Sequence, residues 1–102
     1  MERAAFRIRI RPEKVDEYVA AHAAVWPTLL EAFTEVGIGN YTIFLDGTTA
    51  FGYFEAADIA AAEKAMATRD LNHRWQATMA PLIDEEIHGV GPARLPVIFR
   101  HD

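Results

Sequence analysis

The sequence contains no cysteine, and this absence excludes several kinds of chemistry. Disulfide bonds, thiolate metal sites and a cysteine nucleophile are all ruled out. No segment approaches the ~18 continuous apolar residues that a membrane-spanning helix requires, so we expect no contact with a membrane. The N-terminus begins with charged residues rather than an apolar run, which makes the cytoplasm the expected location.

Positive charge is also scarce, with 10 Lys and Arg against 15 Asp and Glu and a formal net charge of −5. A nucleic-acid partner requires a basic surface that displaces counterions from phosphates. The only local basic cluster, Arg7, Arg9 and Arg11, is too small for that role. The motifs GxGxxG, GxxxxGK[ST] and GxSxG are absent, which argues against nucleotide binding and serine hydrolysis.

The hydrophobic content, in contrast, is high. At 102 residues the chain has the size of one domain, 1–102. It is long enough to fold around a hydrophobic core without disulfide bonds or a structural metal. Its hydrophobic fraction of 51% exceeds the usual share of a globular protein. Such a surplus often covers a second buried surface, so we expect the protein to associate with itself.

The first half of the chain predicts one strand and two helical stretches. Residues 4–11 alternate between apolar and arginine side chains, the period of a strand with one buried face. Pro12 suits the first turn of a helix, and Pro27 should break that helix. A second helical stretch then ends at Gly37.

The middle of the chain predicts an antiparallel hairpin. Strands at residues 40–46 and 49–55 flank the turn dipeptide Asp46-Gly47. The first of these strands carries apolar side chains on both faces. A strand of this kind is normally covered on both faces, and in so small a chain we expect a second subunit to provide one cover.

The second half predicts two helices and a last strand. Asp58 should cap a helix that runs to Ala67, and Asp70 should cap another that runs to Met79. Residues 84–92 read as a loop, and residues 95–100 as a short strand confined to an edge by its proline. The order β-α-β-β-α-β is that of a ferredoxin-like α+β fold, an antiparallel sheet with helices on one face.

Tyr18, His22 and Trp26 stand four residues apart, so on a helix they share one stripe. The apolar positions Val15, Val19 and Val25 place that stripe on the inward side. The three side chains are either an ordinary core or the wall of a polar ligand site. A ligand rich in hydroxyl groups would satisfy several buried polar tips at once.

Two further positions allow both a structural and a functional interpretation. Tyr41 begins the second strand, where it packs across strands or contacts a ligand. Arg74 and Trp75 are either a surface cation–aromatic pair or the hydroxyl-binding and C–H-binding groups of a sugar site. No two histidines show metal-ligand spacing with an acid nearby, so we expect no metal and no other cofactor.

Three segments, taken in order, match a known pattern: Tyr18-x3-His22-x3-Trp26-Pro27, Gly37-x2-Asn40-Tyr41-x-Ile43-x-Leu45-Asp46 and Arg74-Trp75-x3-Met79. The chain thereby resembles the L-rhamnose mutarotase family. The resemblance implies a homodimeric ferredoxin-like α/β barrel, an isomerase (mutarotase) that interconverts the α and β anomers of L-rhamnose or a related sugar without a cofactor. It further implies that His22 is the acid/base residue and that Tyr18, Tyr41 and Trp75 contact the sugar, and Trp26 and Arg74 are candidates for the same site.

The chain departs from the family pattern at two places. Gln76 stands where the family usually has a second tryptophan, and residues 84–91 lack its Asn-Pro-Asp-Asn-Ser-Pro-like stretch. Both positions would line or close the sugar site, so another aldose is an alternative substrate. Other readings of the same fold are a small cofactor-independent monooxygenase and a non-enzymatic dimeric ligand-binding module.

Overall fold

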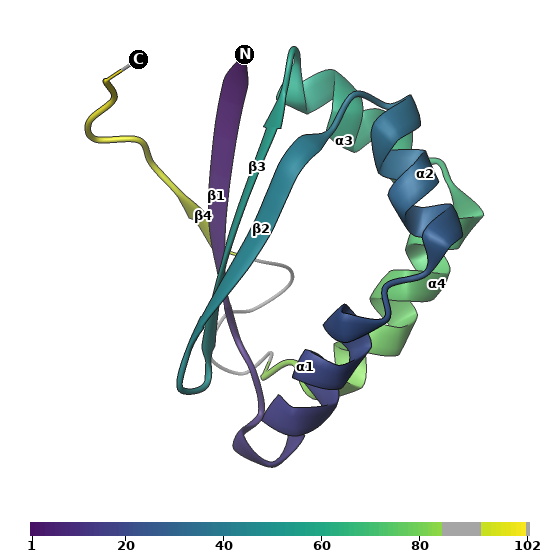
Figure 1. Cartoon of the computed structure of the whole chain (residues 1–102), viewed down its shortest axis with the longest axis vertical. Helices are drawn as coiled ribbons and strands as arrows, with labels where there is room; N and C mark the ends of the chain where they lie inside the picture. The colour runs from purple at the N-terminus through teal and green to yellow at the C-terminus, as the bar shows by residue number, and fades with distance from the viewer. Residues whose placement is uncertain (85–92, 102) are drawn as a thin grey trace.

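A computed structural model of the chain describes residues 1–84 and 93–101. Within these residues one antiparallel sheet has the strand order β2-β3-β1-β4. Figure 1 shows the sheet on one side of the molecule, with the two ends of the described chain near each other. The strands are β1 (Glu2–Arg9), β2 (Gly39–Asp46), β3 (Thr49–Ala56) and β4 (Ala93–Leu95).

The helices all lie on the other side and cover one face of this sheet (Figure 1). Each of the two helical segments of the βαββαβ order consists of two consecutive α-helices. This arrangement confirms the predicted ferredoxin-like α+β fold. The helices are α1 (Val15–Ala23), α2 (Pro27–Glu35), α3 (Ile59–Ala67) and α4 (Asp70–Met79), and short 3₁₀ turns occupy η1 (Pro12–Lys14) and η2 (Ala80–Leu82).

Local sequence signals account for most of the helix and strand limits. Pro27 is the first residue of α2, where its missing N–H costs no hydrogen bond, so the predicted break is present. Gly37 follows α2 with φ of 86° and Gly47 makes the hairpin turn with φ of 61°, the left-handed region that glycine enters without strain. The carboxylate of Asp58 caps α3 by accepting from the Ala61 N–H at 3.0 Å.

Two predicted boundaries are wrong. Asp70 does not cap α4; it is the first residue of the helix, and Arg69 precedes it as the N-cap. The last strand lies at β4 rather than at residues 95–100, because Pro96 lacks the N–H that would continue the ladder. The predicted loop at 84–92 falls outside the described residues apart from Asp84.

The core lies between the sheet and the helices, and β1 and β3 supply its floor. The predicted alternation of β1 is confirmed, because Phe6 is buried and Arg7 is exposed. Along α1 the prediction is only partly right: Tyr18 is buried, but Val19 is 50% exposed and does not share the inward stripe. No helix among the described residues is long and apolar enough to cross a membrane.

Candidate active site

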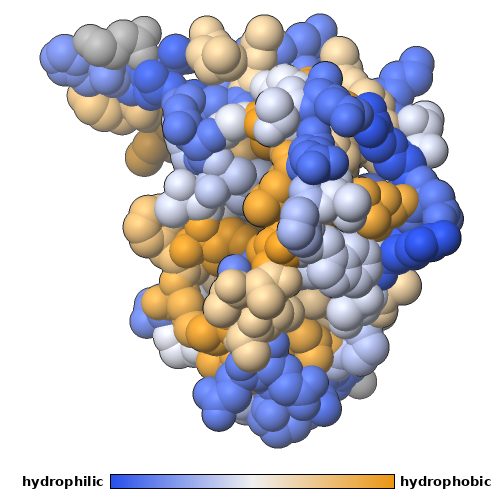
Figure 2. All heavy atoms as spheres, turned by 45° about the vertical axis from the view of Figure 1, so that its right-hand side comes forward, coloured by the Kyte–Doolittle hydropathy of each residue, from blue (hydrophilic) through white to orange (hydrophobic). Residues whose placement is uncertain are grey.

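A cavity of about 520 Å³ lies between the sheet and the helices. Its size falls within the range of ~300–1,000 Å³ that is usual for small-molecule sites. Apolar and aromatic side chains form most of its wall, and hydrophobic residues also gather across the middle of the face shown in Figure 2. The polar or ionisable residues that line it are Tyr18, His22, Tyr41, Glu63, Asn72, Gln76 and Arg94.

His22 lies in the last turn of α1, half-buried, with its side chain at the cavity wall. Its Nδ1 lies 2.7 Å from the backbone oxygen of Tyr18, one turn earlier. A carbonyl oxygen can only accept, so this bond assigns the proton of the neutral ring to Nδ1. Nε2 is then the nitrogen with a free lone pair, the form of histidine that acts as a general base.

Tyr18 is 4% exposed and also lines the cavity, with its ring centroid 4.3 Å from that of His22. Burial raises the pKa of the Tyr18 phenol to about 12, since the charged form would lose its hydration. The phenol therefore keeps its proton at neutral pH and can serve as a hydrogen-bond donor to a ligand.

Tyr41 is part of an aromatic wall contributed by the sheet and α2. Its ring stacks on Phe33 at 5.2 Å and on Phe54 at 5.3 Å, and Phe6 meets it edge-on at 6.1 Å. Although Tyr41 is 40% exposed as a residue, desolvation of its phenol within this wall, reinforced by the charge of Tyr18, raises the pKa of Tyr41 above its ordinary value. The cross-strand packing and the cavity-lining role that the sequence left open therefore coexist in one residue.

The two tryptophans take different places. Trp75 of α4 is 8% exposed, lines the cavity and meets the His22 ring edge-on at 5.6 Å. Trp26 lies in the break before α2 and packs against Trp75 at 5.1 Å, but it is not among the described residues that line the cavity. Trp26 therefore packs behind Trp75, on the far side of that indole from the described cavity lining.

The remaining α4 candidates lie at the edge of the site or outside it. Gln76 is exposed and lines the cavity. The Arg74 side chain is 71% exposed and pairs with Asp70 at 2.8 Å, away from the described lining. His73 donates from Nε2 to the Ala67 carbonyl at 2.7 Å and likewise lies outside it, which leaves His22 as the cavity histidine among the described residues.

Glu63 and Arg94 are lining residues that sequence reasoning missed. Glu63 comes from α3 and Arg94 from β4, and their side chains form an ion pair at 2.8 Å. Nothing local marks either residue, since they are 31 positions apart and meet only because β4 pairs with β1. The described residues contain no group of three or more His, Asp or Glu side chains placed to hold a metal ion.

Together, the fold and the cavity define a ferredoxin-like α+β protein with an aromatic ligand site and a histidine in its wall. Comparison with known proteins makes this assignment more specific. The sequence matches the family model of L-rhamnose mutarotase over residues 3–100, and the chain belongs to that family.

Individual relatives agree with the family match. An L-rhamnose mutarotase of Burkholderia orbicola is 40% identical over 100 residues, which cover 95% of this chain and 89% of that protein. One from Oceanobacillus iheyensis is 36% identical over 85 residues, 81% of each chain.

Two solved structures share the fold. The L-rhamnose mutarotase of Formosa agariphila superposes over the whole of both chains with a TM-score of 0.80 at 21% identity. The tetracenomycin F2 cyclase of Streptomyces glaucescens, a type II polyketide cyclase, superposes over 100% of this chain and 98% of its own with a TM-score of 0.72 at 18% identity. At such low identities both likenesses concern the fold alone.

Proposed function

We propose that this protein is a mutarotase that interconverts the α and β anomers of L-rhamnose, with His22 as the proton-transfer residue. The observation that carries the proposal is the environment of His22. Its Nδ1 is bound to the Tyr18 carbonyl, and its ring lies at the cavity wall between the rings of Tyr18 and Trp75. Membership of the L-rhamnose mutarotase family supports the choice of sugar.

The reaction opens and closes the sugar ring and requires only acid and base catalysis from the protein. A base takes the proton of the anomeric hydroxyl, the C1–O1 bond becomes a carbonyl, and the bond from C1 to the ring oxygen breaks. The ring oxygen keeps the bonding electrons and takes a proton from an acid, and closure on the other carbonyl face gives the other anomer. His22 Nε2 is suited to the base step because the bond at Nδ1 orients the ring.

The other lining residues would bind and orient the sugar. The neutral phenols of Tyr18 and Tyr41 donate hydrogen bonds to sugar oxygens, and the indole of Trp75 packs on the C–H face of the ring. Gln76 adds a polar contact at the exposed edge. We assign Trp26 the supporting role of holding Trp75, and Arg74 no sugar contact within this chain.

The test is anomer exchange of L-rhamnose measured by saturation-transfer NMR. His22→Asn should lower the exchange rate by about 10²- to 10⁴-fold, the usual contribution of general acid–base help, while sugar binding persists. His73→Asn is the matched control, since His73 also donates to a carbonyl but lies outside the described lining. Parent protein that leaves the uncatalysed exchange rate unchanged would refute the function, and an active His22→Asn would refute the role of His22.

We also propose that a second copy of the chain covers the sheet face that carries no helices. Phe44 of β2 is 63% exposed there, and Phe51 lies directly opposite it on β3. Two adjacent phenylalanines on an otherwise open face are more readily explained by self-association than by contact with water. The cytoplasmic location stays a prediction.

A further inference from the structure

We propose that the Glu63–Arg94 ion pair determines which sugar the cavity accepts, by binding two adjacent hydroxyl groups of the ring remote from the anomeric carbon. The proposal rests on the proposed function, which places the anomeric carbon at His22. For L-rhamnose the hydroxyls in question are those on C3 and C4. The pair would thus set substrate specificity, whereas His22 would carry the chemistry.

The pair is half-exposed at the cavity wall and keeps unused hydrogen-bonding capacity. One N–H of Arg94, at Nη2, donates to Oε2 of Glu63 at 2.8 Å, and the two side chains are 48% and 46% exposed. A guanidinium has five N–H groups and a carboxylate has about four acceptor positions, so most of both remain available. A hydroxyl both donates and accepts, so adjacent hydroxyls match a carboxylate beside a guanidinium.

The sheet register orients Arg94 toward the cavity. Arg94 lies opposite Phe6 in the β1–β4 ladder, so the two side chains share the face that the helices cover. The guanidinium lies 5.7 Å from the ring centroid of Phe54, and Phe54 in turn stacks on Tyr41. Arg94 is therefore anchored to the same aromatic wall that would bind the sugar.

The ion pair and His22 belong to different ends of the site. His22 comes from α1 and Glu63 from α3, and Figure 1 shows these helices at opposite ends of the helical layer. Tyr41 connects the two ends, because it lines the same cavity as His22 and stacks on Phe54, over which the Arg94 guanidinium lies. A ring that spans these groups would contact His22 at one side and the pair at the other.

The charge of the lining favours an uncharged sugar. Glu63 and Arg94 neutralise each other, and the buried phenol of Tyr18 is protonated at neutral pH. A sugar carboxylate or phosphate bound at Arg94 would lie beside the Glu63 carboxylate, and the two negative charges would repel each other. The pair therefore selects for hydroxyl groups and against acidic sugars.

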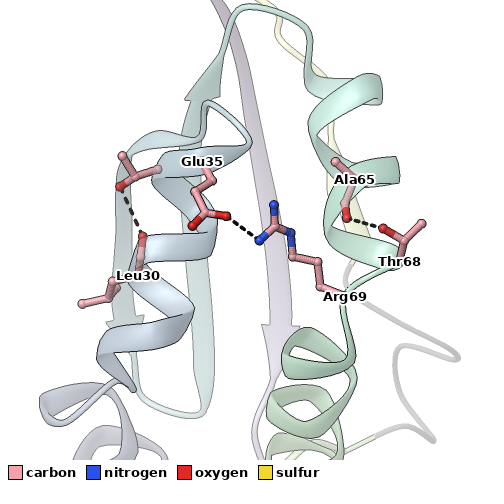
Figure 3. A network of polar contacts seen from close by, with 6 residues as sticks. Leu30, Glu35, Ala65, Thr68 and Arg69 are labelled. Carbon is pink, nitrogen blue, oxygen red and sulfur yellow. Dashed lines mark hydrogen bonds and ion pairs between the residues drawn. The ribbon is translucent and has the colours of Figure 1, made fainter.

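The experiment compares Glu63→Gln and Arg94→Gln with the same changes in a control pair. Glu35 and Arg69 form a carboxylate–guanidinium contact of 2.6 Å that joins α2 to the start of α4, and neither residue lines the cavity (Figure 3). Anomer exchange and sugar binding are measured by NMR for L-rhamnose, its 3-deoxy and 4-deoxy analogues and a hexuronate. Thermal melting verifies that each variant folds.

We expect Glu63→Gln and Arg94→Gln to lower kcat/KM for L-rhamnose by roughly 10- to 100-fold through KM, as the loss of a charged hydrogen bond predicts. An analogue that lacks a bound hydroxyl should bind weakly to the parent, and its affinity should change little in the variants. Glu63→Gln leaves Arg94 without its carboxylate partner and should strengthen hexuronate binding by about 10-fold. Glu35→Gln and Arg69→Gln should change neither the preference for L-rhamnose over its deoxy analogues nor the binding of the hexuronate.

If the Glu63 and Arg94 variants keep the parent's ratios of kcat/KM and of affinity among the sugars, the proposal is overturned. Equal changes in these ratios in the Glu35 and Arg69 variants would also overturn it. Failure of the proposed function gives a different result, namely a parent protein that exchanges no anomers. If that parent still binds sugars and Glu63→Gln weakens the binding selectively, the specificity role stands without the mutarotase activity. A parent that binds none of the sugars would overturn both.

Discussion

The ring of Phe6 on β1 fills the space above Gly52 on β3, its partner in the antiparallel ladder. A Cβ on Gly52 would stand 2.0 Å from Cζ of that ring, closer than atoms can approach. Phe6 is 5% exposed and contacts Tyr41 and Phe54, so its ring has little room to move. The absence of a side chain at position 52 therefore shapes the aromatic floor of the cavity.

Gly52→Ala should accordingly destabilise the protein, by about 1–3 kcal/mol as is usual for overpacked cores, and disturb the cavity floor. Urea unfolding measures the stability change. Gly39→Ala is the matched control, because nothing lies within 4 Å of its added Cβ, and it should be nearly neutral. Equal stability of the two variants would contradict the packing argument.

The raised pKa of Tyr18 predicts alkaline sensitivity. Above pH 10.0, the ordinary value, the unfolded chain releases this proton, whereas the folded protein holds it until the pH approaches about 12. The unfolded state then binds fewer protons, so the free energy of unfolding falls over this window, by on the order of 2 kcal/mol.

Tyr18→Phe removes this titration and should show a smaller alkaline loss of stability than the parent. Urea unfolding of both proteins at pH 8, 10 and 11 measures the difference. The same alkaline loss in both would show that Tyr18 does not titrate differently in the two states.

Gln76 offers a test of the edge of the site, because it is exposed and lines the cavity. An indole at this position would fill space and remove an amide, so Gln76→Trp should shift the preference among aldoses by about 10-fold, a difference typical of altered pocket contacts. The change in stability should stay within about 0.5 kcal/mol, as for most surface positions. Ala77→Trp, at an exposed position outside the described lining, should leave the preference unchanged, and parallel effects of both variants would refute the role of Gln76.

The proposed homodimer predicts a particle of twice 11.4 kDa in light scattering at micromolar concentration. Phe44→Asp should shift it toward the monomer, because a buried unpaired carboxylate at an interface is costly. Leu30→Asp is the control, since Leu30 is 51% exposed on α2, on the helical side of the molecule. A folded parent protein that scatters as a monomer would exclude the dimer.

Much of the fold follows from short-range chemistry that the sequence displays. The proline at 27 and the glycine at 37 limit α2, and the hairpin turns at Gly47 because only a residue without a Cβ tolerates that backbone freely. The spacing of Tyr18 and His22 places both at one cavity wall. At the start of α4 the sequence pattern was misleading, because Asp70 is a preferred capping residue but lies inside the first turn, and Arg69 precedes the helix without a side-chain cap hydrogen bond.

The sequence by itself therefore determined the order of elements, the ferredoxin-like class and the helix that carries His22, since periodicity, caps and turns act within a few residues. Only the tertiary structure decided which polar groups share the cavity. It left Trp26 behind Trp75, excluded Arg74 from the described lining, and brought in Glu63 and Arg94. The reason is that these positions depend on the strand register of β4 and on helix packing, contacts between distant residues that no local pattern encodes.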